Sequence, residues 1–353
     1  MLRVMIDHVF AGHHDHSAML QDGPPPAAVH WALRAVARGG RVVSVEPLKG
    51  GISHANHVIR IDAGGRTLDV VLRRWVRDCP QEAETGFSAE REASTYGLLA
   101  SSMVLAPRLL ASDVDGRECD VPALLLTREP GMAPAKPAEM RSFLAQLAAA
   151  LPPIHSIDPG AAERTVPPYR PYYVADDLHP PAWARSSSDW ERAIEAVAEP
   201  RPAAFGPGEA LRAAGPAAIH PTALGPAAPP PAAPAAPAAP AAPAAFIHRD
   251  YHPGNTLWAS GRLTAVVDWA TASWGPPAVD VAHMRANLAM SFDLEVADAF
   301  LRAYLATVGT SYIHEPFWDL RVAVDFLPEL RSESRPEFDR LADFVARALA
   351  ALA

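Results

Sequence analysis

The segment from residue 246 to residue 269 limits the fold of this chain more than any other part. Asp250 and Asn255 follow one short apolar strand, and Asp268 ends the β-branched run 263–267. Short apolar runs separated by turn signals are typical of antiparallel strands. The spacing lets all three polar side chains face one point.

The turn signal at Ser260-Gly261 predicts a hairpin between residues 256–258 and 263–267. Paired residues on antiparallel strands lie roughly 4.5–5.5 Å apart at Cα. A hairpin centred between Gly261 and Arg262 pairs Trp258 with Ala265, Leu257 with Val266, and Asn255 with Asp268.

This pairing predicts a magnesium site. An amide oxygen of Asn255 and a carboxylate of Asp268 that lie this close can bind one hard cation, and oxygen ligands suit Mg²⁺. Asp250 lies five residues before Asn255, with Pro253-Gly254 turning the chain between them. It supplies a third carboxylate, free to accept a proton. The arrangement indicates phosphoryl transfer, with Asp250 as the catalytic base.

The string His248-Arg249-Asp250-Tyr251-His252-Pro253-Gly254-Asn255, with the pair Asp268-Trp269, resembles the aminoglycoside phosphotransferase (APH) family. These proteins are small-molecule kinases with a protein-kinase-like fold. The resemblance implies an α+β, two-lobed architecture: a small antiparallel sheet with one main helix, and a larger, mainly helical lobe. It also implies that ATP is the phosphoryl donor.

The catalytic loop of protein kinases has the same His-Arg-Asp-x-x-x-x-Asn spacing. Protein kinase activity is disfavoured, because Asp268 is followed by Trp269-Ala270 and no Ala-Pro-Glu follows. By resemblance, His248 anchors the catalytic loop through a backbone hydrogen bond. Arg249 has no expected function, since no phosphorylated activation loop is expected.

The N-terminal half has the order expected of the small lobe: a helix over 27–40, and strands over 41–45, 57–61 and 68–73. By resemblance, Gly50, Gly51 and Ser53 in the loop between the first two strands cover the ATP phosphates.

The third strand ends in Arg73, where a lysine is expected to bind phosphates. A guanidinium still offers bidentate phosphate contacts. By resemblance, Glu92 on the helix 89–99 is its partner, with Glu90 as the alternative. The apolar strand 123–127 leads to a hinge where Thr127 and Glu129 are expected to contact the nucleotide.

These elements predict a leader over 1–26, an N-lobe over 27–127 and a C-lobe over 128–353. A Pro/Ala-rich insertion, 203–244, interrupts the C-lobe; its Pro-Ala-Ala triplets predict an extended, mobile chain.

Three further features belong to the C-lobe. The aromatic segment 169–190 is either an acceptor-pocket wall or a core, and the core is favoured. His155, at the end of a helix over 140–155, is expected to be structural. Asp280 is expected to cap the following helix and to brace the catalytic loop, although Pro276 departs from the family pattern.

Composition excludes several classes. A net charge of −9 argues against a nucleic-acid binder, and no uncharged apolar run approaches the length of a membrane span. Two cysteines give no disulfide framework, so a cytoplasmic location is expected. Acids outnumber arginines 14 to 9 over residues 246–353, which would favour a cationic acceptor.

Several functions stay open. The acceptor could be an aminoglycoside, a macrolide, another antibiotic, or a metabolite such as choline or a sugar. The chain could instead be a non-catalytic nucleotide-binding module that lost turnover through Arg73 and Pro276, or a scaffold acting through its Pro/Ala segment. A monomer and a dimer are both compatible with the sequence.

Overall fold

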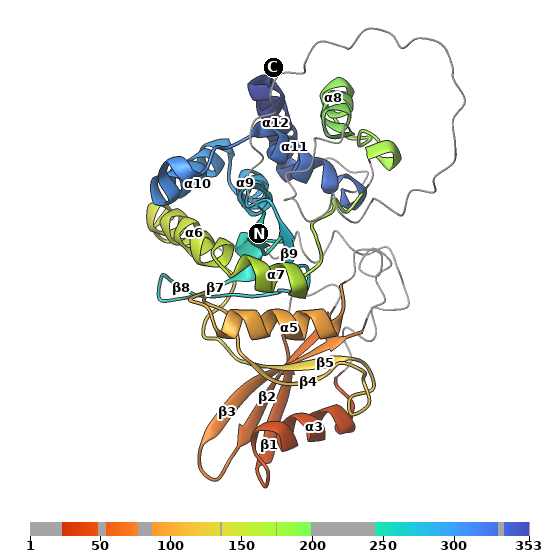
Figure 1. Cartoon of the computed structure of the whole chain (residues 1–353), viewed down its shortest axis with the longest axis vertical. Helices are drawn as coiled ribbons and strands as arrows, with labels where there is room; N and C mark the ends of the chain where they lie inside the picture. Colours follow the sequence, from red (N-terminus) through yellow and green to blue (C-terminus); the bar gives the residue numbers. More distant parts are fainter. Residues whose placement is uncertain are drawn as a thin grey trace, which may run out of the picture.

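A computed structural model of the chain describes residues 23–48, 54–76, 87–134, 136–173, 175–198, 244–330 and 335–352. The molecule has two lobes, a β-sheet lobe and a helical lobe (Figure 1). Most of the expected leader and nearly all of the expected insertion lie outside the described residues. Within the described part, no helix is long and apolar enough to span a membrane.

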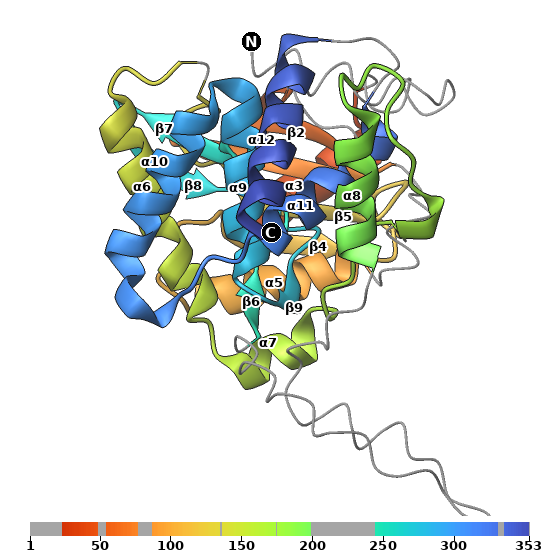
Figure 2. The ribbon, with the colours of Figure 1, turned by 90° about the horizontal axis from the view of Figure 1, so that it is seen from above.

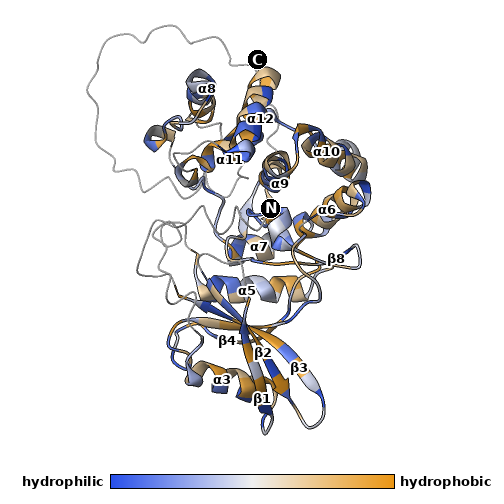
Figure 3. Cartoon of the chain, turned by 180° about the vertical axis from the view of Figure 1, so that it is seen from behind, coloured by the Kyte–Doolittle hydropathy of each residue, from blue (hydrophilic) through white to orange (hydrophobic). Residues whose placement is uncertain are grey.

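The β-sheet lobe is built on five antiparallel strands in the order β1-β2-β3-β5-β4. Their bounds are β1 Arg41–Pro47, β2 His54–Asp62, β3 Thr67–Trp75, β4 Leu109–Asp113 and β5 Ala123–Thr127. β4 was not predicted from the sequence; it is the edge strand of the sheet, beside β5. Figure 3 shows hydrophobic and hydrophilic residues alternating along β2 and β3, as expected of strands with two different faces.

Two helices cover the two faces of this sheet. Helix α3 (Pro26–Val36) packs Trp31 in one core cluster with Leu125 of β5. Helix α5 (Ala89–Ala100) packs Tyr96 in another with Leu124 and Leu126. Because successive strand residues point to opposite faces, β5 contributes to both cores and is buried between them.

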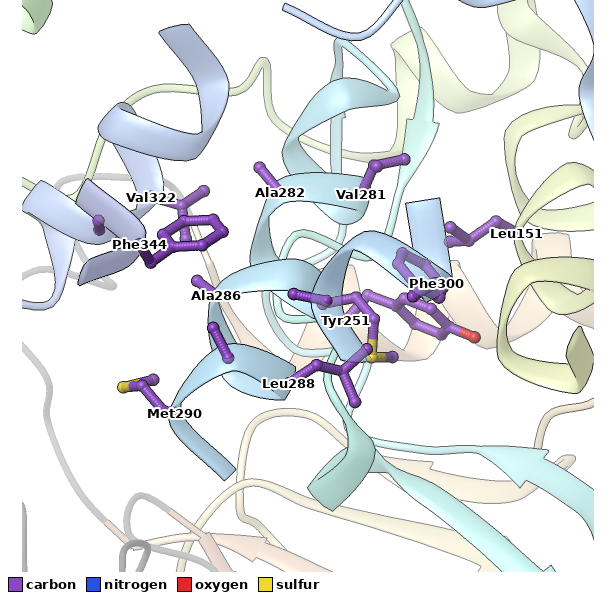
Figure 4. Close-up of a cluster of buried hydrophobic side chains, with 14 of the residues drawn as sticks. Leu151, Tyr251, Val281, Ala282, Ala286, Leu288, Met290, Phe300, Val322 and Phe344 are labelled. Carbon is purple, nitrogen blue, oxygen red and sulfur yellow. The ribbon is translucent and has the colours of Figure 1, made fainter. Parts of the chain in front are cut away.

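The helical lobe is built around α9 (Ala278–Ser291), which contacts α10, α11 and α12 (Figure 2). Nearly every residue of α9 is buried, as expected of a helix surrounded by others. Figure 4 shows Val281, Ala282 and Leu288 in this core, together with Tyr251 and Phe300. The other helices are α6 Met140–His155, α7 Pro159–Thr165, α8 Ser187–Ala198, α10 Leu294–Val308, α11 Pro316–Asp325 and α12 Pro336–Leu352.

Two short antiparallel strand pairs lie between the β-sheet lobe and the core helices of the helical lobe (Figure 1). β6 (Ala245–Ile247) pairs with β9 (Ser273–Gly275), and β7 (Thr256–Ala259) pairs with β8 (Arg262–Val266). β6 leads into the predicted catalytic loop.

The predicted register of the second pair is wrong by one to two residues. Leu257 pairs with Ala265, and Trp258 pairs with Leu263. The turn is the two residues Ser260 and Gly261, with φ of 49° and 75°, and a bulge follows Leu257. Turns of this kind, with positive φ at both central residues, are favoured between antiparallel strands.

The chain between the lobes is attached to this second pair. Met132 and Trp258 exchange two backbone hydrogen bonds of 2.9 and 3.1 Å. Gly131, with φ of 106°, lies so close that a Cβ would come within 2.5 Å of the Trp258 carbonyl oxygen. Only glycine fits this close approach.

Candidate active site

The loop between β6 and β7 brings Asp250 and Asn255 together. The Asn255 amide nitrogen donates to Oδ2 of Asp250 at 2.9 Å and to its backbone carbonyl at 3.0 Å. His252 accepts the backbone N–H of Gly254 on Nδ1 at 3.1 Å and so caps the short 3-10 turn Pro253–Asn255. The Asp250 side chain stays 35% exposed, open to a substrate.

Asp280 supports this loop from the first turn of α9. Its carboxylate accepts the backbone N–H groups of His248 at 3.0 Å and Arg249 at 2.7 Å. His155 contacts the same carboxylate at 3.0 Å. The expected bracing is therefore confirmed, whereas the expected helix capping is wrong: the N-cap position is Pro277, and no side chain caps the helix.

His248 lies behind the loop. Its side chain is completely buried, and Nε2 lies 3.0 Å from the carbonyl oxygen of Val267. This is the backbone hydrogen bond that the sequence predicted. Because Val267 directly precedes Asp268, His248 connects the two parts of the site; the structure gives it a positioning contact.

Arg73 is the centre of a buried group of charges that joins the two lobes. Its Nε lies 3.0 Å from the Glu92 carboxylate, and its Nη2 lies 2.5 Å from Oδ1 of Asp268. The same Nη2 lies 3.1 Å from Nδ1 of His54. Glu92 is thus the partner of Arg73, while the alternative, Glu90, is exposed.

The pKa values in this group reflect burial and pairing. Burial works against ionisation of Asp268, yet Arg73 holds the pKa of its carboxyl at about 2. The pKa of His54 is well below its usual value, because the ring is buried and Arg73 is close. Asp268 is therefore fully ionised at neutral pH, and His54 is neutral.

Two residues next to the site have a left-handed backbone. Arg249 has a φ of 72° and Asp268 a φ of 66°. Such conformations are uncommon for residues other than glycine, and they cluster at functional sites. Each turn re-aims the chain directly beside a carboxylate of the site.

Arg249, for which no function was expected, is buried among aromatic rings. Its guanidinium carbon lies 3.7 Å from the ring centre of Tyr172 and 5.0 Å from that of Phe87. One Nη donates to the carbonyl of Arg170 at 2.8 Å. Arg249 thus connects the catalytic loop to the aromatic segment.

The aromatic residues of the segment 169–190 differ in their burial. Tyr169, Trp183 and Trp190 are buried in core clusters, which confirms the favoured core interpretation for these three. Tyr172 is only partly buried and contacts Arg249.

Of the remaining expected nucleotide contacts, the structure describes Thr127 and Glu129, at the end of β5. Thr127 donates its hydroxyl to Glu129 at 2.6 Å and accepts the N–H of Arg108, so these side chains shape the end of β5. Gly50, Gly51 and Ser53 lie outside the described residues.

The donor set at Asn255 and Asp268 fits magnesium. The amide nitrogen of Asn255 donates to Asp250, which leaves its side-chain carbonyl oxygen as the group that could bind a cation. Asp268 is ionised, and 37% of its side chain is exposed. Both offer hard oxygen ligands.

Two histidines beside Asp250 carry contacts that the sequence reading did not predict. Nε2 of His283 lies 3.5 Å, and Nε2 of His252 lies 3.7 Å, from Oδ1 of Asp250. His252 stands within the motif. His283 stands outside it, three residues after Asp280; that helical spacing was the one available signal.

Comparisons with known proteins identify the family. The chain matches the phosphotransferase enzyme family (APH) over residues 44–319. Among curated proteins, no sequence matches it significantly.

Solved structures show the same fold at low identity. Aminoglycoside phosphotransferase APH(4)-Ia is 18% identical, with 93% of this chain and 98% of that chain covered and a TM-score of 0.51. A candidate aminoglycoside phosphotransferase from Ralstonia eutropha JMP134 is 14% identical, with 92% and 98% covered and a TM-score of 0.52. The family match spans most of the sequence and includes every element of the site, so the chain belongs to the APH phosphotransferase family.

Proposed function

We propose that this protein is an ATP-dependent phosphotransferase that transfers the γ-phosphoryl group to a hydroxyl of a small molecule. Two arrangements observed together carry the proposal. Asp250 is held by Asn255 and stays exposed, while Arg73 joins Glu92 to Asp268 across the lobes.

In this mechanism Asp250 accepts the proton of the acceptor hydroxyl. The acceptor oxygen bonds to the γ-phosphorus as the bond between that phosphorus and the β,γ-bridging oxygen breaks, so the products are ADP and a phosphate ester. General-base help of this kind contributes roughly 10²–10⁴-fold. Asn255 fixes Asp250 before the substrate arrives, which reduces the cost of orientation.

Asn255 and Asp268 would hold Mg²⁺, which neutralises phosphate charge when bound. Arg73 is oriented by Glu92 and supplies a permanent positive charge beside the same phosphates. Gly50, Gly51 and Ser53 are proposed to cover them, and Thr127 with Glu129 to border the nucleotide.

Relatives support the nucleotide and one acceptor class. A variant of APH(4)-Ia forms a ternary complex with ADP and hygromycin B, and another with AMP-PNP and hygromycin B. For this chain we propose an adenine nucleotide and an aminohydroxyl acceptor, with an aminoglycoside as the first candidate. A choline- or sugar-type metabolite is the alternative within the same chemistry.

A direct assay tests the proposal. The purified protein is incubated with Mg-ATP and a panel of aminoglycosides, macrolides and aminohydroxyl metabolites, and ADP and the phosphorylated product are followed by mass spectrometry. We expect the wild-type protein to form a phosphorylated product. In Asp250→Ala the rate of product formation should be at least ~10²-fold lower.

Nucleotide binding without turnover on any acceptor would favour a non-catalytic module. Asn287→Ala is a suitable control, because this residue is in α9 and its amide donates to the backbone of His283 without contacting Asp250.

A further inference from the structure

Helix α9 meets the catalytic loop at two points one turn apart. Asp280 accepts the backbone N–H groups of His248 and Arg249. His283, three residues later, places Nε2 at 3.5 Å from Oδ1 of Asp250. Residues three apart lie on one face of a helix, so the face that holds the loop backbone also meets its carboxylate.

The surroundings of His283 fix its ring. The residue is 8% exposed, and its ring packs edge-on against Phe326 with centroids 5.3 Å apart. His252 flanks it at 5.8 Å between ring centroids. Burial lowers the pKa of His283 to about 4, so the imidazole is neutral at physiological pH and can donate a proton in a hydrogen bond without losing it.

The two oxygens of the Asp250 carboxylate have different neighbours. Asn255 binds Oδ2 at 2.9 Å, whereas Oδ1 faces His283 at 3.5 Å and His252, from within the loop itself, at 3.7 Å. His283 is the nearer of the two and the one that comes from helix α9. The last torsion of an aspartate has a broad energy minimum, so one hydrogen bond leaves the carboxylate plane free to rotate. A second donor on the other oxygen removes that freedom.

We infer that His283 is a positioning residue for Asp250, donating its Nε2–H to Oδ1 and holding the carboxylate plane toward the acceptor hydroxyl. The neighbouring carboxylate selects the tautomer with the proton on Nε2. Hydrogen bonds of catalytic groups are often long in the free protein and tighten in the substrate complex, so we expect the 3.5 Å contact to shorten when substrate binds. The inference rests on the proposed phosphotransferase activity and adds to it a residue outside the sequence motif.

Three substitutions at one position test it. His283→Gln places an amide N–H near the position of Nε2, His283→Asn places one too short to reach Asp250, and His283→Leu has none. We expect the single-turnover rate of phosphoryl transfer to fall about tenfold in the Asn and Leu variants, the size of one lost hydrogen bond to a charged group. Gln should recover to within about threefold of wild type.

Two measurements separate positioning from folding. The KM for nucleotide should stay within about twofold of the wild-type value in all three variants. Calorimetry should give the wild-type binding stoichiometry for nucleotide, which shows that the variants are folded. His314→Leu is the matched control: His314 is a comparably buried histidine whose Nε2 lies 2.9 Å from Asp319. Its loss should lower stability without changing the rate.

The possible failures are distinct. If the wild-type protein forms no phosphorylated product on any acceptor, the proposed function is wrong. If product forms and Asp250→Ala leaves it unchanged, Asp250 is not the base and the assignment of His283 fails with it. If Asp250→Ala abolishes product formation while His283→Asn and His283→Leu stay within twofold of wild type, only the assignment of His283 is wrong. Equal losses in Gln, Asn and Leu would also overturn it, because the N–H would then be irrelevant. If Leu does not fold, the Gln–Asn pair decides.

Discussion

Two buried arginines hold the site, and their surroundings differ. The Arg73 cluster (Arg73, Glu92, His54 and Asp268) compensates the guanidinium with two carboxylates. The Arg249 cluster (Arg249, Phe87, Tyr169 and Tyr172) encloses it with aromatic rings and one backbone carbonyl. Removing the first arginine would leave buried charges unpaired, whereas removing the second would mainly remove packing. The cost of each loss should therefore differ.

The largest effect is expected at Arg73. Arg73→Met should lower the free energy of unfolding by about 3–5 kcal/mol, because Glu92 and Asp268 lose their shared counter-charge. Nucleotide affinity should fall as well. Urea denaturation followed by tryptophan fluorescence measures the first, and calorimetry the second.

Arg73→Lys is the matched control, since it keeps the charge but cannot reach both carboxylates with a planar fork. An intermediate loss is expected. Wild-type stability in Arg73→Met would show that the ion pairs contribute nothing net, and the contrast between the clusters would fail.

A smaller loss is expected at Arg249. Arg249→Met should cost about 2 kcal/mol, from the cation–π contacts and the unsatisfied carbonyl of Arg170. The turnover number should change less than in Asp250→Ala, because Asp280 binds the loop through backbone N–H groups that remain. A loss equal to that of Arg73→Met would contradict the comparison.

Acid should distinguish the clusters further. His54 has a lowered pKa through burial and Arg73, so the folded state binds this proton less readily than the unfolded chain. The stabilisation is present above the unfolded pKa of about 6.5 and is lost as pH falls below it, at up to about 1.4 kcal/mol per pH unit.

Urea denaturation at a series of pH values from 7.5 to 5 measures how the free energy of unfolding changes with pH. His54→Gln should flatten this dependence relative to wild type. Arg249→Met should keep the contribution of His54 to the slope, because it leaves the Arg73 cluster intact and because burial keeps Tyr169 and Tyr172 neutral across this range. An unchanged slope in His54→Gln would mean that His54 does not titrate as expected.

The smallest effect is expected for the Pro/Ala-rich insertion. Deleting residues 204–243 should change the free energy of unfolding by less than about 2 kcal/mol, the scale of loop-closure entropy. Nucleotide binding should persist. Loss of function on deletion, with folding retained, would favour the scaffold interpretation.

The sequence predicted the local elements of the site well. The helix over 140–155 matches α6 at both ends, and Arg73 pairs with Glu92 as expected. Motif spacing and hydrophobic pattern are local properties, so they can be read without tertiary information.

The errors arose where tertiary contacts decide. The hairpin register depends on a bulge after Leu257, and no local sequence pattern predicts a bulge at this position. Arg249 and His283 acquire their contacts from segments far along the chain, so their surroundings could not be inferred from spacing. β4 is a short edge strand whose pairing with β5 defines it.

The close approach at Gly131 gives the connection between the lobes a fixed pivot. Two backbone hydrogen bonds join Met132, in the chain that follows β5, to Trp258 in β7, the strand that begins directly after Asn255. Because these backbone groups are hydrogen-bonded to each other, a displacement of the chain at Met132 is transmitted directly to the strand that follows Asn255. A side chain at position 131 would push the hairpin outward and misalign both lobes at once.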